Sequence, residues 1–137
     1  MLKKILQNKG FHINKEPIEN LPTAFLGESF YKKSKPNIAF LVEYDALPEL
    51  GHACGHNASA AASIGAALAL SECIKKWHLK GTLIAMGTPG EENISCKSIM
   101  VKQGIFKNID LAMMVHSGDY WLLDPKAIAL EALEINF

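Results

Sequence analysis

Six side chains in this sequence could together do metal chemistry, because each comes just after an apolar run or in a glycine-bracketed turn. They are Asp45, Cys54, His56, Glu91, Glu92 and His116. Thiolate, imidazole and carboxylate groups are the protein ligands of zinc and related divalent ions. The set therefore predicts a divalent metal site, provided that the fold brings the six residues together.

The spacing of Cys54 and His56 limits where they can act as a pair. Residues two apart diverge by about 200° on a helix, whereas in an extended segment they point the same way. We therefore expect both to lie in the turn before a helix, where Gly51 and Gly55 give the backbone freedom. A helix N-terminus also favours the thiolate form of a cysteine, which is the form that binds metal.

The adjacent pair Glu91 and Glu92 suggests two different tasks, because neighbouring side chains diverge. One carboxylate would bind metal and the other would face a water molecule or substrate as general base and acid. Asp45 would either contact a metal-binding side chain and fix its orientation, or bridge two ions itself.

The elements that must position these residues alternate between strands and helices. Apolar runs at 38–42, 82–86 and 111–115 are typical of buried strands, and 58–76 is predicted to be a helix capped by Asn57. The other predicted elements are helices at 2–9 and 98–103, strands at 11–13, 23–26 and 128–137, and a polar loop at 32–37. The fold class is α/β, with a mostly parallel or mixed sheet and helices on both faces. Parallel strands would collect the candidate residues at one carboxyl edge.

Composition narrows the class of protein. The chain has 137 residues, 49% of them hydrophobic, and equal numbers of basic and acidic residues, 14 of each. These values fit one globular domain and give no broad positive field for nucleic acid. The sequence shows no signal peptide and no membrane span, and its three cysteines are an odd number for a disulfide scaffold. We expect a cytoplasmic protein with no nucleic-acid or membrane partner.

Each candidate residue has a structural explanation when taken alone. A single cysteine is most often a small buried apolar group, and histidines and loop carboxylates are often caps or solvated side chains. Cys73 and Cys96 are interpreted as structural, and His52 as either a turn residue or a substrate contact. The metal hypothesis depends on the convergence of the six residues.

Four motifs occur in an order that resembles the M20 family of metallopeptidases, nearest to its amidohydrolase subfamily. They are the segments 43–48 (EYDALP), 51–57 (GHACGHN), 87–92 (GTPGEE) and 113–116 (MMVH). The resemblance implies that Cys54, His56, Glu92 and His116 hold two divalent ions, zinc or manganese. It implies that Glu91 is the general base and acid and that Asp45 supports the metal site. The implied reaction is hydrolysis of an amide in an N-acyl amino acid, an aminobenzoyl-glutamate-like compound or a dipeptide.

The resemblance also implies that residues 1–137 are the first part of a catalytic domain, without the lid and dimerisation domain. A further histidine ligand would then be missing, and we expect this chain to be inactive alone, needing a C-terminal half or forming a homo-oligomer. Two alternatives remain open. One is a non-catalytic module with a structural ion, and the other is a cysteine hydrolase with Cys54 as nucleophile.

Overall fold

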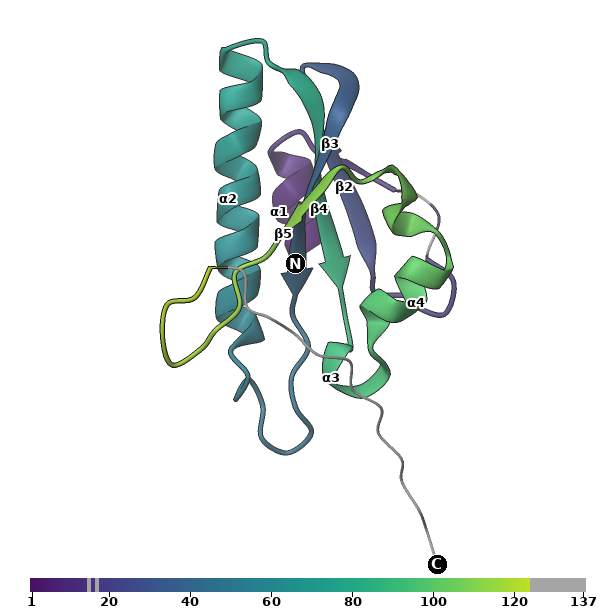
Figure 1. Ribbon diagram of the computed structural model, residues 1–137, viewed down its shortest axis with the longest axis vertical. Helices are drawn as coiled ribbons and strands as arrows, with labels where there is room; N and C mark the ends of the chain where they lie inside the picture. The colour runs from purple at the N-terminus through teal and green to yellow at the C-terminus, as the bar shows by residue number, and fades with distance from the viewer. Residues whose placement is uncertain (15, 17, 124–137) are drawn as a thin grey trace, which may run out of the picture.

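The computed structural model describes residues 1–14, 16 and 18–123 (Figure 1). Its elements are α1 (Leu2–Asn8), β1 (His12–Ile13), β2 (Phe25–Ser29), β3 (Lys32–Glu43), α2 (His56–Lys76), β4 (Lys80–Thr88), α3 (Glu91–Ile94), α4 (Cys96–Lys102), the 3-10 turn η1 (Ile105–Asn108) and β5 (Leu111–Met113). The predicted strand at 128–137 lies outside the described residues.

The described strands form one mixed sheet in the order β1-β2-β4-β3-β5. β3 runs parallel to β4 and to β5, while β1 and β2 are antiparallel to their neighbours. The long helix α2 is the crossover between the parallel strands β3 and β4, as a βαβ unit requires. The α/β class with a mixed sheet is confirmed.

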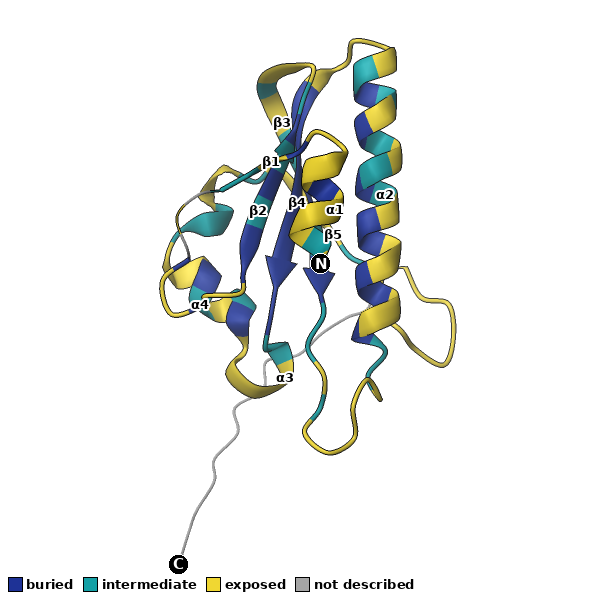
Figure 2. Cartoon of the chain, turned by 180° about the vertical axis from the view of Figure 1, so that it is seen from behind, coloured by how far each residue is buried: buried dark blue, intermediate teal, exposed yellow. Residues whose placement is uncertain are grey.

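Helices cover both faces of the sheet, as predicted. Figure 2 shows α2 to the right of the strands, α1 in front of them, and α4 to their left. Alternate residues of β4 point to opposite faces: Leu83 and Ala85 pack under α1 and α2, whereas Ile84 and Met86 pack toward α4. The central strand is therefore buried on both sides, which explains its continuous apolar run.

Helix α2 is the described helix that is long and apolar enough to cross a membrane by length and composition. Its residues Ala60, Ile64 and Ala67 are buried in the core against the sheet. One face of α2 is therefore packed inside the domain.

Three local predictions are wrong. The segment 32–37 is the first half of β3 and not a loop; it joins the β4 ladder through a register shift between Lys32 and Asn37. β5 is shorter than predicted and exposed, because it is the last strand on its side of the described sheet. α2 begins at His56, with Gly55 at its N-cap in the left-handed conformation (φ 72°), so Asn57 is not the cap.

Candidate metal centre

The carboxyl ends of β3, β4 and β5 meet the N-terminus of α2 at one edge of the sheet. In Figure 1 the arrowheads of β3 and β4 point toward α3 and the start of α2. Glu43 is the last residue of β3, Glu91 and Glu92 begin α3 after β4, and His116 follows β5. The predicted convergence at this edge therefore exists, and Glu43 joins it.

Two imidazoles and one buried carboxylate lie at the centre of this edge. The rings of His56 and His116 meet edge to face, with centroids 5.4 Å apart. Glu43 Oε2 lies 3.2 Å from His56 Nε2 and 3.6 Å from His116 Nε2, and the Glu43 side chain is 2% exposed. One potential ligand atom from each residue lies within 4.8 Å of the others. Such a cluster has the size and donor types of a metal site.

Asp45 fixes the orientation of His56. Its Oδ1 lies 3.0 Å from His56 Nδ1, and its Oδ2 accepts a hydrogen bond from the Glu92 backbone N–H at 3.1 Å. Because a carboxylate can only accept, the contact with Asp45 requires a proton on His56 Nδ1, and Nε2 is then the ring nitrogen that a metal ion could bind. Nε2 also lies 3.5 Å from Glu92 Oε1. Asp45 thus holds both the His56 ring and the start of α3.

Cys54 is next to Glu92 in this structure. A hydrogen bond with Glu92 is the main cause that raises the pKa of the Cys54 thiol, followed by burial and by the charges of Glu92, Asp45 and Glu43. The shift is therefore opposite to the expectation that the helix N-terminus favours the thiolate, because carboxylates surround the thiol. The predicted extended turn is also wrong for His56, which is already helical.

The segments that carry Cys54 and His116 are tied together beside the cluster. Ser117 Oγ donates a hydrogen bond to the Cys54 carbonyl oxygen. Gly55 permits this approach, since a Cβ at that position would collide with the Ser117 hydroxyl. The glycine is therefore needed both for its positive φ and for the space that it leaves.

Glu91 turns away from Glu92 and binds α4. Its Oε2 accepts hydrogen bonds from Cys96 Sγ and the Lys97 backbone N–H, both at 3.1 Å, and lies 3.2 Å from Lys97 Nζ. Burial raises the pKa of Glu91, but the hydrogen bonds from Cys96 and Lys97 outweigh it, so the pKa lies below its ordinary value. Glu91 is therefore ionised at neutral pH and able to accept a proton.

Three residues of this edge escaped the sequence analysis as functional candidates. Glu43 ends an otherwise apolar run two residues before Asp45, a spacing that places both on the same side of an extended strand. Cys96, interpreted as structural, donates to Glu91, and Lys97 contacts both Glu43 and Glu91. No local pattern marks Lys97, because its partner Glu43 is 54 residues away.

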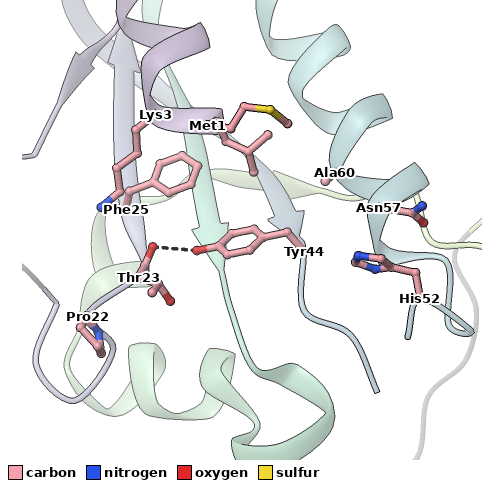
Figure 3. Close-up of a pocket in the computed structure, with 10 residues that line it drawn as sticks. Met1, Lys3, Pro22, Thr23, Phe25, Tyr44, His52, Asn57 and Ala60 are labelled. Carbon is pink, nitrogen blue, oxygen red and sulfur yellow. Dashed lines mark hydrogen bonds between the residues drawn. The ribbon is translucent and has the colours of Figure 1, made fainter. Parts of the chain in front are cut away.

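A cavity of about 530 Å³ opens on the α1 and α2 side of the sheet (Figure 3). Phe25 and Tyr44 line it with stacked rings, 6.2 Å between centroids, and His52 and Asn57 line it from the turn and helix that carry Cys54 and His56. Tyr44 donates to the Thr23 carbonyl oxygen at 2.7 Å, and burial raises its pKa to about 12. The volume of this cavity is that of a small-molecule site.

The residues of the cluster fit a divalent cation. Glu43 Oε2 is buried and, within the described part of the chain, receives no hydrogen bond. An unpaired buried carboxylate oxygen is costly, and a cation between it and the two imidazoles would compensate it. Imidazole and carboxylate, the donors of this cluster, are common protein ligands of divalent metal ions.

Comparison with known proteins agrees with this geometry. No family model matches the chain. It is 34% identical over 132 residues to one of the subunits of the p-aminobenzoyl-glutamate hydrolase of Escherichia coli, covering 84% of this chain and 27% of that protein. It is 40% identical over 108 residues to the Xaa-Arg dipeptidase of Mus musculus, covering 74% of this chain and 25% of the dipeptidase.

The fold matches a crystal structure of a Bacillus subtilis protein described as a dinuclear metal-binding peptidase from the M20 family. The TM-score is 0.69 at 24% identity, covering 81% of this chain and 34% of that one. The chain belongs to the M20 peptidase family. It spans about a quarter of the length of these two curated relatives. The M20 fold explains why the metal-ligand types follow successive strands of this sheet.

Proposed function

We propose that this chain provides the metal-binding part of a hydrolase that cleaves the amide bond of an N-acyl amino acid, an aminobenzoyl-glutamate-like compound or a dipeptide. The observation that carries the proposal is the cluster of Glu43, His56 and His116, whose ligand atoms lie within 4.8 Å of one another. Two relatives support this substrate class: one is named as a subunit of p-aminobenzoyl-glutamate hydrolase and the other as an Xaa-Arg dipeptidase.

The proposed ligands are Cys54, His56, Glu92 and His116, and the proposed occupants are two divalent ions, with Asp45 supporting the site through His56. Zinc and manganese both suit this set, and the Cys54 thiolate leans toward zinc. When bound, the ions would polarise the amide carbonyl and make a water molecule more acidic. Glu43 Oε2, which faces both imidazoles, is an additional carboxylate of this centre.

Glu91 is the proposed general base and acid. Its Oε2 is held by Cys96 and Lys97, and the hydrogen bonds found in the described residues leave Oε1 free. A carboxylate with one anchored oxygen can take a proton on the other and return it to a leaving amine without moving. Glu91 is ionised at neutral pH and so starts in the form that accepts a proton, although its lowered pKa makes it a weaker base than an ordinary glutamate.

The cysteine-hydrolase alternative is less well supported. A nucleophilic cysteine needs a lowered pKa and a nearby base. The pKa of Cys54 is instead raised by its carboxylate neighbours, chiefly Glu92. The structural-ion alternative is also weaker, because structural zinc sites are closed by four Cys or His ligands and this edge is rich in carboxylates.

We further propose that residues 1–137 are the first part of a catalytic domain whose lid and dimerisation domain lie elsewhere. The small share of each relative that the chain spans supports this. Its partners would be a small amide substrate and either a C-terminal half or a second copy. A cytoplasmic location is supported by three free cysteines, none of them in a disulfide.

The test is Glu91→Gln in a chimera in which this chain replaces the matching segment of the Escherichia coli relative, with Glu72→Gln on the exposed face of α2 as the matched control. We expect Glu91→Gln to lower hydrolysis of p-aminobenzoyl-glutamate by about 10²–10⁴-fold with metal content unchanged. Activity that survives chelators but not alkylation of Cys54 would contradict the proposal. Turnover by the 137-residue chain alone at more than about 1 s⁻¹ would contradict its inactivity.

A further inference from the structure

Lys97 occupies an unusual place beside the candidate metal centre. It lies in α4, on the opposite face of the sheet from α2, and its side chain is 23% exposed. Its Nζ contacts Glu43 Oε1 and lies 3.2 Å from Glu91 Oε2. One ammonium group therefore binds two carboxylates that come from different strand ends.

These contacts divide the oxygens of the acidic residues into two groups. Glu43 Oε1 and Glu91 Oε2 are turned toward α4, where Lys97 lies between them. Glu43 Oε2 and Glu92 Oε1 are turned toward His56 Nε2, at 3.2 and 3.5 Å. The vicinal glutamates thus take different directions because one of them has a cation to bind.

We propose that Lys97 is a positioning residue that acts as a permanent cation beside the metal centre. It keeps one oxygen of Glu43 and the carboxylate of Glu91 out of the space between the imidazoles. That leaves Glu43 Oε2 and Glu92 to face a metal ion, and Glu91 to exchange protons. The inference rests on the proposed function for the identity of the ion, but the Lys97–Glu43 pair itself requires no ion.

Two consequences follow from the charges. In Lys97→Met, Glu43 and Glu91 lose their shared cation and both become available to a metal ion, so metal affinity rises although the metal-free protein is less stable. If Lys97 only supported α4, its loss would leave metal affinity unchanged or lower it. The direction of the change in affinity separates the two roles.

The first measurement is a calorimetric titration of the metal-free 137-residue chain with Mn²⁺ at neutral pH. We expect Lys97→Met to bind about tenfold more tightly than the unsubstituted chain. Lys97→Arg, which keeps the charge, and Lys102→Met, an exposed lysine of the same helix, should bind as the unsubstituted chain does. Equal or weaker binding by Lys97→Met overturns the proposal.

The second measurement is a double-mutant cycle on thermal unfolding without metal. Glu43→Gln removes the buried charge that Lys97 neutralises, so adding Lys97→Met to it should lower the melting temperature far less than Lys97→Met does alone. If Lys97→Met fails to fold, the double variant should recover the fold. Additive shifts, or a double variant that remains unfolded, overturn the pairing. Absence of Mn²⁺ binding by every variant would instead count against the proposed function, while this cycle still decides the role of Lys97.

Discussion

Asp45→Asn offers the most direct test of how His56 is prepared to bind metal. The Asp45 carboxylate accepts at both oxygens, from His56 Nδ1 at 3.0 Å and from the Glu92 backbone N–H at 3.1 Å. An asparagine has one acceptor oxygen and one amide that only donates. It cannot serve both donors at once.

The asparagine has two orientations, and both carry a cost. If its oxygen keeps the Glu92 N–H, its NH₂ group faces His56 Nδ1, which must then be the unprotonated nitrogen. The proton moves to Nε2, the atom that faces Glu43 and Glu92, and blocks its lone pair. In the other orientation the oxygen keeps His56 Nδ1, and the NH₂ group of the asparagine faces the Glu92 backbone N–H at the start of α3, so that two donors meet.

The expected loss can be worked from these contacts. A hydrogen bond to a charged group contributes about 1.5–3 kcal/mol, and each 1.4 kcal/mol is about tenfold in an equilibrium constant. Asp45→Asn should therefore weaken Mn²⁺ or Zn²⁺ binding by roughly 10- to 100-fold, the range found when residues behind metal-binding histidines are changed. The melting temperature should fall as well, because the asparagine keeps only one of the two hydrogen bonds that Asp45 accepts.

Two assays check this prediction. Titration calorimetry gives the affinity, and nitrogen chemical shifts of the His56 ring report which nitrogen carries the proton before metal is added. Asp110→Asn is the matched control, since its carboxylate binds Lys35 and the Asn37 backbone N–H. Metal binding by Asp45→Asn within about twofold of the control would refute the reasoning, as would a His56 proton that stays on Nδ1.

Two further predictions concern the turn before α2. The pKa of Cys54 is raised, so the thiol keeps its proton at neutral pH and must release it to bind metal. Metal affinity should therefore rise with pH. Calorimetry in buffers of different ionisation enthalpy counts the protons released on metal binding, and Cys54→Ser should release one fewer than the unsubstituted chain. Occupancy that is unchanged down to about pH 4 would contradict this ligand assignment. Gly55→Ala combines a φ of 72° with a collision at Ser117 and should lower the free energy of unfolding by about 2 kcal/mol. Its control is Gly65→Ala, where α2 has open space and the change should stabilise by about 0.5–1 kcal/mol; equal melting temperatures for the two variants would refute the strain at Gly55.

Much of the scaffold follows from local sequence patterns. Continuous apolar runs predicted the cores of β3 and β4, because a central strand that is buried on both faces needs an apolar side chain at each successive position. The run of small residues between them predicted α2. Parallel pairing of β3 with its neighbours then brings the strand ends to one edge. This is why His56, Glu92 and His116 could be expected to meet without knowledge of any contact.

Tertiary structure alone decided which way each side chain turns and what it binds. The polar segment 32–37 became strand because a bulged register let it pair with β4, and backbone pairing leaves no mark in side-chain periodicity. Glu43 and Lys97, 54 residues apart, meet only because α4 packs on the face of the sheet opposite α2. The same contact separates Glu91 from Glu92. Hydrophobic burial depends on neighbours along the chain and can be predicted from them, whereas the partner of a buried charge is chosen by packing between distant segments.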